Sequence, residues 1–269
     1  MIRKILLSTF FLVLLQVNSS IAGTTGSEEL SKKSNASANE CFEGFSRAMF
    51  DFNHALDGAI FKPVAKGYRA LPVVIRKGTG NAIDNLRSLL TLSNNLLQGD
   101  FKRAGNTAGR FAINTTVGIL GVFDPASALG LKEDGKEDFG QTMGVWGAEP
   151  GCYFVLPILG PTTTRDAVGL IGNVFVDPVY QITHNTEIRN EIVGNGNYSE
   201  HNYYYYRSAG AVDFRAKNIE SFDSLQKNSI DLYASVKSLY LQDRAKKIKN
   251  SEDSVSTQDD SDWEEIDTN

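Results

Sequence analysis

The sequence has few of the residues on which enzymes and metal sites depend. It contains two cysteines and three histidines. The histidines, His54, His184 and His201, lie far apart and form no HExxH or related metal pattern. There is no GxSxG nucleophile elbow of a lipase, no GxxxxGK[ST] phosphate loop and no basic stripe typical of nucleic-acid binding. We therefore expect a protein that is not an enzyme, holds no metal or cofactor and binds no nucleic acid.

Acidic residues in the middle of the chain are the remaining candidates for acid–base chemistry. Glu137, Asp138 and Asp166 could form a pair of carboxylates. Arg165 directly precedes Asp166 and offers a positive partner. A structural salt bridge is therefore the favoured interpretation.

A secretory signal peptide is indicated at residues 1–22. Arg3 and Lys4 form a basic start, 13 mostly apolar residues follow from Ile5 to Val17, and Ser20-Ile21-Ala22 before Gly23 gives a predicted small-residue cleavage site. A permanent transmembrane anchor is the less favoured alternative, because a spanning helix needs about 18 apolar residues or more.

The two ends of the remaining chain differ from its middle. Residues 23–40 are small and polar, which predicts a flexible leader. Residues 250–269 are predicted to be a disordered tail, with eight acidic and no basic residues from Glu252 to Asn269. This tail is either a solvated end or a docking peptide for a basic partner. Residues 41–249 contain no linker or repeat, so we expect a single domain there.

Helical spacing dominates the predicted domain. The expected helices span Phe42–Ile60, Val73–Leu97 and Phe101–Thr116, with breaks at Pro63 and Pro72. Gly99 is the expected C-terminal cap of the second helix, and Asp100 the N-terminal cap of the third.

Further helices are expected after residue 160. One begins at Arg165, with Thr162 to Thr164 available as caps, and ends at Asp177-Pro178. Residues 212–249 form another helical stretch with a break near Asn228. Its basic last turn could touch anionic headgroups. This turn comprises Arg244, Lys246, Lys247 and Lys249.

Strands are expected only at Tyr153–Leu156 and Val174–Val176. The segment from Glu137 to Asp166 is so rich in glycine and proline that a long helix or strand is implausible. The predicted fold is mainly α, with a glycine-rich irregular segment and little β-structure.

Two apolar features are candidates for contact with lipid. The helix from Phe42 to Ile60 carries an aromatic stripe, which suits either a protein core or the acyl boundary of a bilayer. Residues Val117 to Leu131 form two short apolar arms around Asp124, predicted as a re-entrant hairpin or, alternatively, as a buried loop. The residues expected to contact lipid are Phe42, Phe45, Met49, Phe52, Ile60, Val117, Ile119, Leu120, Val122 and Phe123.

Cys41 and Cys152 are the two cysteines. In an oxidising compartment they could form one disulfide, and closing a loop of about 110 residues would stabilise the fold by about 4 kcal/mol. Free thiols are the alternative. A metal site is disfavoured because no histidine lies at ligand spacing.

Several motifs together resemble one family. GQTMGVWG, LPILGPTTTRDAVG and FDPASALGL, with FEGFSRAMFDFNHALD, LLQGDFKRAG and VDFRA, are similar to segments of MlaA (VacJ), the outer-membrane phospholipid-trafficking family. The resemblance extends in order from about Phe42 to Arg244. It implies a ring-like helical bundle with an amphipathic central channel on the periplasmic side of the outer membrane.

The resemblance also implies a function and partners. Such a protein associates with a trimeric porin, removes misplaced phospholipid from the outer leaflet, and passes it to a soluble periplasmic carrier, which maintains lipid asymmetry. No cofactor is implied. Independently of the resemblance, we expect the bend at Asp124 to help shape the lipid path. The residues assigned to the channel wall by motif match are Asp138, Gln141, Trp146, Arg165 and Asp166.

One feature departs from the family pattern. The family's signal ends at a cysteine that becomes lipidated, whereas no cysteine follows this apolar run before Cys41. A lipid anchor is therefore in doubt. The alternative function is a secreted surface or host-interaction protein that keeps the scaffold without transporting lipid.

Overall fold

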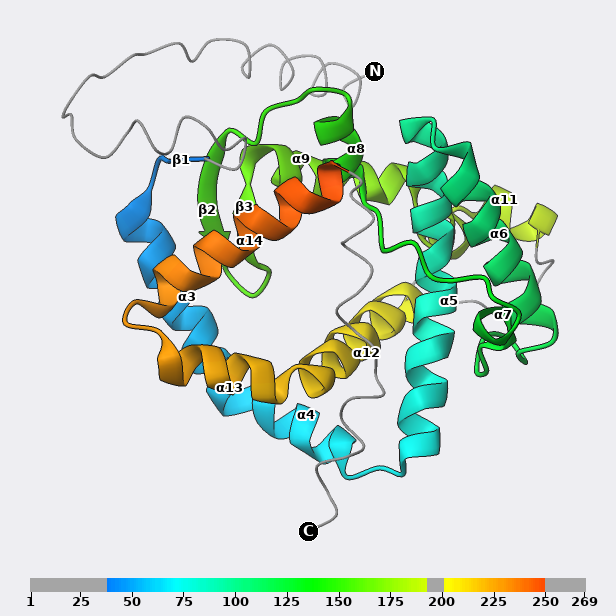
Figure 1. Ribbon diagram of the computed structural model, residues 1–269, viewed down its shortest axis with the longest axis horizontal. Coiled ribbons are helices and arrows are strands. Elements are labelled where there is room, and N and C mark those ends of the chain that lie inside the picture. The colour runs from blue at the N-terminus through cyan, green and yellow to red at the C-terminus, as the bar shows by residue number, and fades with distance from the viewer. Residues whose placement is uncertain (1–37, 193–200, 250–269) are drawn as a thin grey trace. The chain divides into compact units, whose positions relative to one another are not determined.

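The computed structural model describes residues 38–192 and 201–249 (Figure 1). The predicted signal peptide at residues 1–22 and the predicted tail at 250–269 lie outside the described residues. The predicted leader at 23–40 extends too far, because the compact unit begins at Ala38 and Asn39–Glu40 form strand β1. A parallel pairing of β1 with a later strand orders these two residues.

The described chain is mainly helical, as predicted. The elements before the middle of the chain are α3 (Glu43–Leu56), the π-helix η1 (Asp57–Phe61), α4 (Lys62–Arg69), α5 (Val73–Gln98), α6 (Phe101–Thr116), α7 (Pro125–Ala128) and α8 (Phe139–Val145). The later helices are α9 (Thr164–Val176), α10 (Pro178–His184), α11 (Thr186–Ile192), α12 (His201–Lys217), α13 (Ile219–Asn228) and α14 (Leu232–Ile248).

Several helix ends follow local capping chemistry and confirm the predictions. Gly99 ends α5 in the left-handed conformation, with φ 77°. The Asp100 carboxylate accepts a hydrogen bond from the Arg103 amide at 3.1 Å and begins α6. The Thr163 hydroxyl accepts one from the Asp166 amide at 3.2 Å and begins α9.

The predicted helix break at Pro63 is wrong. The chain stays helical from Glu43 to Arg69, and only the region of Pro72 interrupts it. The π-helical turn η1 precedes Pro63, which lies in the first turn of α4. A first-turn proline removes no needed hydrogen-bond donor, so the widened turn accommodates it.

A small sheet has the order β1-β2-β3. Strand β2 (Cys152–Leu156) pairs in parallel with β1 and antiparallel with β3 (Gly160–Thr163). The predicted strand at Tyr153–Leu156 is confirmed. The predicted strand at Val174–Val176 is wrong, because these residues end α9; a short apolar run cannot by itself distinguish a strand from a buried helix segment.

Packing contacts connect the elements in a closed circuit (Figure 1). α3 packs on β2, which pairs with β3, and β3 packs on α9. α9 packs on α8 and α5, and α5 packs on α12. α12 packs on α4, which continues α3 through η1 and so closes the circuit. α14 contacts both β3 and α8. This closed circuit agrees with the ring-like bundle that the resemblance implies.

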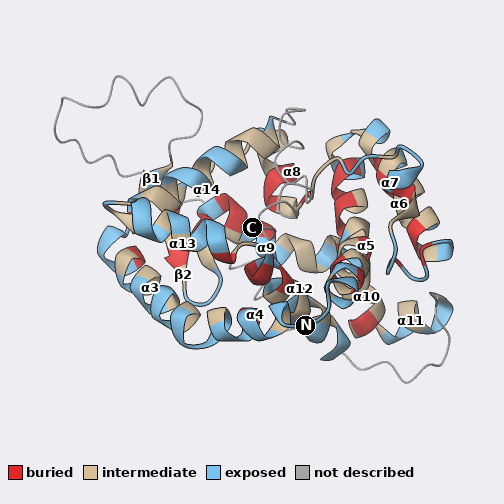
Figure 2. Cartoon of the chain, turned by 60° about the horizontal axis from the view of Figure 1, so that its bottom comes forward, coloured by how far each residue is buried: buried red, intermediate tan, exposed pale blue. Residues whose placement is uncertain are grey.

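The interior of the described chain is unusually polar. Its hydrophobic core consists of two small clusters, one around Ala65, Ala216 and Ile219 and the other around Tyr153, Val155 and Tyr233. Polar and charged residues outnumber hydrophobic ones among the buried side chains of the described chain, while many large hydrophobic residues are exposed. Figure 2 shows how the buried and exposed residues are distributed over the helices. A water-soluble domain shows the opposite distribution.

Candidate functional site

An apolar surface follows α3, η1 and α4, which Figure 2 shows as largely exposed. Phe42, Phe45, Phe52 and Ile60 are exposed by 63%, 54%, 49% and 51%. Met49 differs from them because it packs, partly buried, against the Tyr153 cluster. Met49 therefore offers less free surface than its neighbours, and its contact with lipid stays a prediction. α3 faces the core on one side only, and the rest of its aromatic stripe is free for an apolar environment.

A second apolar surface is the turn at residues 117–123, here called the apolar tip. Val117, Ile119, Leu120 and Phe123 are exposed by 70%, 63%, 73% and 55%, whereas Val122 is exposed by 38%. The alternative of a buried loop is therefore wrong.

The backbone of the apolar tip is strained but internally bonded. Ile119 and Leu120 have positive φ angles of 53° and 56°, a conformation that costs branched and bulky residues free energy. The Gly121 amide donates to the Asn114 carbonyl at 2.8 Å, and the Phe123 amide to the Gly118 carbonyl at 2.9 Å. These bonds satisfy the condition under which irregular backbone can enter an apolar medium.

A third apolar group lies at the turn between β2 and β3. Ile158 and Leu159 are exposed by 64% and 68%. Asn53 on α3 holds this turn, since its amide nitrogen donates to the Leu156 carbonyl at 2.8 Å and its oxygen accepts from the Ile158 amide at 2.6 Å. Sequence reasoning did not single out these residues, although the apolar run up to Leu159 between glycines was a signal for them.

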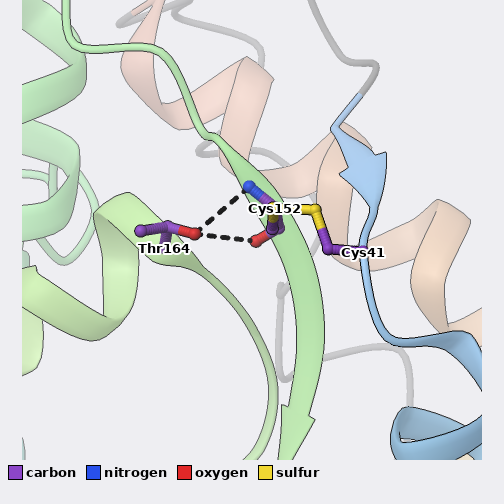
Figure 3. Close-up of a disulfide and its surroundings, with 3 residues drawn as sticks. All are labelled: Cys41, Cys152 and Thr164. Carbon is purple, nitrogen blue, oxygen red and sulfur yellow. Dashed lines mark hydrogen bonds between the residues drawn. A yellow bond between two sulfur atoms is a disulfide. The ribbon is translucent and has the colours of Figure 1, made fainter. Parts of the chain in front are cut away.

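A disulfide joins Cys41 and Cys152 (Figure 3), with their Cα atoms 5.6 Å apart. The pairing of β1 with β2 sets Asn39 opposite Cys152 and so brings Cys41 within reach. Thr164 braces the same strand: its hydroxyl oxygen accepts from the Cys152 amide at 3.2 Å. In this form Cys41 has no free thiol for lipidation.

A buried ion cluster fastens α14 to α8 and α9. Arg244 donates to both carboxylate oxygens of Asp138, at 2.6 and 3.0 Å, and to those of Asp166, at 2.7 and 3.1 Å. Arg165 donates to Asp166 at 3.0 Å, and the Tyr240 hydroxyl donates to it at 2.6 Å. The predicted salt bridge between Arg165 and Asp166 is present, but Asp138 pairs with Arg244 instead.

The pKa shifts in this cluster are those of ion-paired carboxylates. Burial alone would raise the pKa of Asp138, but the hydrogen bonds and charge of Arg244 outweigh it and hold that pKa well below its usual range. For Asp166, burial is likewise outweighed by the charge and hydrogen bonds of Arg244, and the pKa is lowered. Both carboxylates are ionised at neutral pH, so neither is poised as a general acid.

The assignment of Arg244 to headgroup contact is therefore wrong, because its side chain is only 11% exposed and points into the cluster. Tyr240 and Arg244 lie four residues apart on one face of α14, a spacing that could have identified them as partners of the same buried group.

Two glycines make room for this arrangement. A Cβ on Gly169 would lie 2.5 Å from the Gly140 Cα, and one on Gly140 would lie 2.8 Å from the Arg244 guanidinium.

The other predicted channel-wall residues are also hydrogen-bonded within the protein. Gln141 is buried and donates to the Lys136 carbonyl at 3.2 Å and to Asp138 at 3.1 Å. Asp124 caps α7 and pairs with Arg110 at 3.0 Å. Trp146 is 57% exposed, and its indole donates to the Leu97 carbonyl at 3.1 Å. Their place in a channel wall stays a prediction.

Two features are absent from residues 38–192 and 201–249. Within these ranges no group of three or more His, Cys, Asp or Glu side chains is arranged to hold a metal ion. In the same part of the chain, none of the helices combines the length and hydrophobicity that crossing a bilayer requires.

Comparison with known proteins agrees with this architecture. The MlaA lipoprotein family model matches residues 38–247. An uncharacterized protein of Rickettsia prowazekii (strain Madrid E) is 41% identical over 146 residues, which is 54% of this chain and 58% of that protein. The chain thus spans just over half the length of this relative.

Relatives with longer matches carry a descriptive name. The intermembrane phospholipid transport system lipoprotein MlaA of Haemophilus influenzae (strain ATCC 51907 / DSM 11121 / KW20 / Rd) is 31% identical over 242 residues, covering 88% of this chain and 90% of that protein. The Escherichia coli (strain K12) protein of the same name is 31% identical over 204 residues, 74% of each chain.

A solved structure also matches, from work on the structural basis for maintenance of bacterial outer membrane lipid asymmetry. It has a TM-score of 0.64 and 29% identity, and the match covers 77% of this chain and 98% of that one. The chain belongs to the MlaA lipoprotein family.

Proposed function

We propose that this protein is the outer-membrane component of a phospholipid transport system. It would remove phospholipids from the outer leaflet and pass them through an amphipathic channel to a periplasmic carrier. The observation that carries the proposal is the distribution of side chains in the described residues: many large apolar side chains are exposed, and most buried side chains are polar or charged. The names of the relatives in Haemophilus influenzae and Escherichia coli support it.

The distribution of side chains suits transport without a chemical step. Exposed phenylalanines on α3 and the apolar tip would settle the protein in the acyl region, where their burial is favourable. Polar side chains inside the circuit of helices would accommodate headgroups. On this proposal the protein lies on the periplasmic side of the outer membrane, beside a trimeric porin, and needs no cofactor.

Replacement of Phe123 by aspartate is expected to weaken membrane residence. Phe123 is 55% exposed on the apolar tip, and a carboxylate entering the acyl region costs about 2 kcal/mol. This corresponds to a roughly 30-fold weaker partition. Flotation of the purified chain with phospholipid vesicles measures the effect.

Phe101→Asp is the matched control. Phe101 is 74% exposed at the opposite end of α6, about 24 Å from the tip at a rise of about 1.5 Å per residue. The flotation of Phe101→Asp with vesicles should equal that of the wild type. Equal partition of the wild type and Phe123→Asp would contradict insertion of the tip.

Deletion of the gene tests the function itself. Outer-leaflet phospholipid should rise on deletion and return to normal with the wild-type gene. The alternative, a secreted surface or host-interaction protein, is supported if the outer leaflet stays normal and the protein is recovered in the soluble periplasm or the medium rather than with detergent-extracted outer membranes.

A further inference from the structure

A polar cavity of about 70 Å³ lies between α5, α6 and the loop that precedes α8. It is separate from the ion cluster at Arg244. α5 contributes Asp84 and Asn85, α6 contributes Arg110, and the loop contributes Asp134 and Lys136. Most of the residues around it are polar or charged, so it suits a hydrophilic ligand.

The charges around the cavity favour a cationic group. Its ionisable lining comprises the four acids Asp84, Asp124, Glu133 and Asp134 and the two bases Arg110 and Lys136. Arg110 is already occupied by Asp124, at 3.0 Å, and by the Ser127 hydroxyl, also at 3.0 Å. Asp84 and Lys136 form a pair at 2.6 Å that remains partly exposed, with side chains 31% and 36% accessible.

A buried amide supplies an additional acceptor. Asn85 is 7% exposed and lines the cavity. Its amide nitrogen donates to the Thr115 hydroxyl at 2.9 Å, whereas its carbonyl oxygen has no hydrogen-bond partner in the described part of the chain. This oxygen is accessible rather than buried, so it is free to accept a hydrogen bond from a ligand N–H.

These groups discriminate between kinds of headgroup. A zwitterion with a primary ammonium matches the exposed Asp84–Lys136 pair, with the ammonium facing Asp84 and Asn85 and the phosphate facing Lys136. A choline group has no N–H to donate, and Phe111 is the one aromatic side chain among the lining residues, so a cage for quaternary ammonium is absent there. The excess of carboxylates repels anionic headgroups.

The cavity also borders the apolar tip. Asn81, which lines it, donates to the Val122 carbonyl at 3.1 Å, and Asp124 directly follows the exposed Phe123. A headgroup in the cavity would therefore leave its acyl chains beside the apolar tip.

We propose that this cavity binds phosphoethanolamine headgroups and makes the protein selective for phosphatidylethanolamine, an inference that rests on the proposed lipid-transport function. Asp84 and Asn85 hold the ammonium and Lys136 the phosphate. The preference comes from hydrogen bonds that only a primary ammonium can donate.

Calorimetric titration of the full chain in detergent tests the site. Soluble phosphoethanolamine should bind at least about tenfold more tightly than phosphocholine or inorganic phosphate. Asp84→Asn should weaken the binding of phosphoethanolamine about tenfold. Asp223→Asn is the matched control, because Asp223 forms a similar exposed pair with Lys62 at 2.7 Å on α13. Thermal unfolding of each variant checks that it is folded.

Lipid bound after extraction from membranes provides the second arm. Phosphatidylethanolamine should be enriched over phosphatidylglycerol in the wild type and in Asp223→Asn, but not in Asp84→Asn. Binding of the soluble compound without enrichment of the lipid would identify a free-metabolite site and reject the lipid proposal. Equal affinity for phosphoethanolamine and phosphocholine would reject the cavity altogether. A normal outer leaflet after gene deletion, with the headgroup preference intact, would overturn only the transport function.

Discussion

Arg244→Met is expected to lower the free energy of unfolding by about 3 kcal/mol at neutral pH, because it leaves two carboxylates without their main positive partner. The side chains of Arg244 and Asp166 are 11% and 7% exposed. The Asp138 side chain is 26% exposed, so solvent screens part of the loss and the lower end of the range for buried pairs applies.

The loss should depend on pH in a defined direction. The pKa values of Asp138 and Asp166 are lowered in the folded protein. Their contribution to stability is therefore complete above the unfolded pKa of about 4 and is lost as the pH falls through the folded values. Without Arg244 the largest lowering cause is lost, so both pKa values should rise, and protonation would relieve the variant. The difference in unfolding free energy between wild type and variant should thus shrink as the pH falls toward about 4 and continue to shrink below it.

Denaturant unfolding at pH 7 and pH 3.5 measures both effects. Lys247→Met is the control on the same helix, since Lys247 pairs with Asp243 at 2.7 Å on the surface, with side chains 37% and 55% exposed. It should change stability by less than about 1 kcal/mol. If Arg244→Met were no more destabilising than Lys247→Met, the ion cluster would not be what holds α14 in place.

Removal of the disulfide is expected to cost about 4 kcal/mol. Cys41 and Cys152 are separated by 111 residues, and a cross-link over such a distance removes much conformational entropy from the unfolded chain. The Cys41→Ser/Cys152→Ser double variant should unfold at a lower denaturant concentration than the oxidised wild type. Reduction of the wild type should reproduce this loss.

The double variant provides its own control, because reductant should leave its stability unchanged. The bridge also holds β1 against β2, so amide exchange at Asn39 and Glu40 should accelerate in the variant. Equal stability of the oxidised and reduced wild type would show that the pairing of β1 and the bonds of Thr164 suffice without the bridge.

The predictable parts of the fold depend on neighbours in sequence. Gly99, Asp100 and Thr163 cap helices through atoms only a few residues away, so their roles could be predicted without a structure. Pro63 shows the limit of such reasoning. A proline usually ends a helix, but a π-helical turn before it keeps the helix continuous.

The candidate site was predictable in composition and only partly in arrangement. The apolar residues of α3 and of the apolar tip could be recognised from their spacing and lack of charge, and most of them are exposed. Met49 belongs to the same stripe, yet it packs against the cluster of Tyr153, Val155 and Tyr233, whose members lie more than 100 residues away. Spacing identifies the face of a helix, whereas the side that a neighbour covers depends on the packing of distant segments.

The amino-acid sequence alone determined the helical character of this protein, its scarcity of catalytic groups and its family, because these depend on local spacing and on motifs. Only the tertiary structure decided that Arg244 is buried between Asp138 and Asp166, that Cys41 reaches Cys152, and that polar side chains line a cavity between α5 and α6. The energies of ion pairs, disulfides and cavities depend on distances between residues far apart in the chain, and folding alone sets those distances.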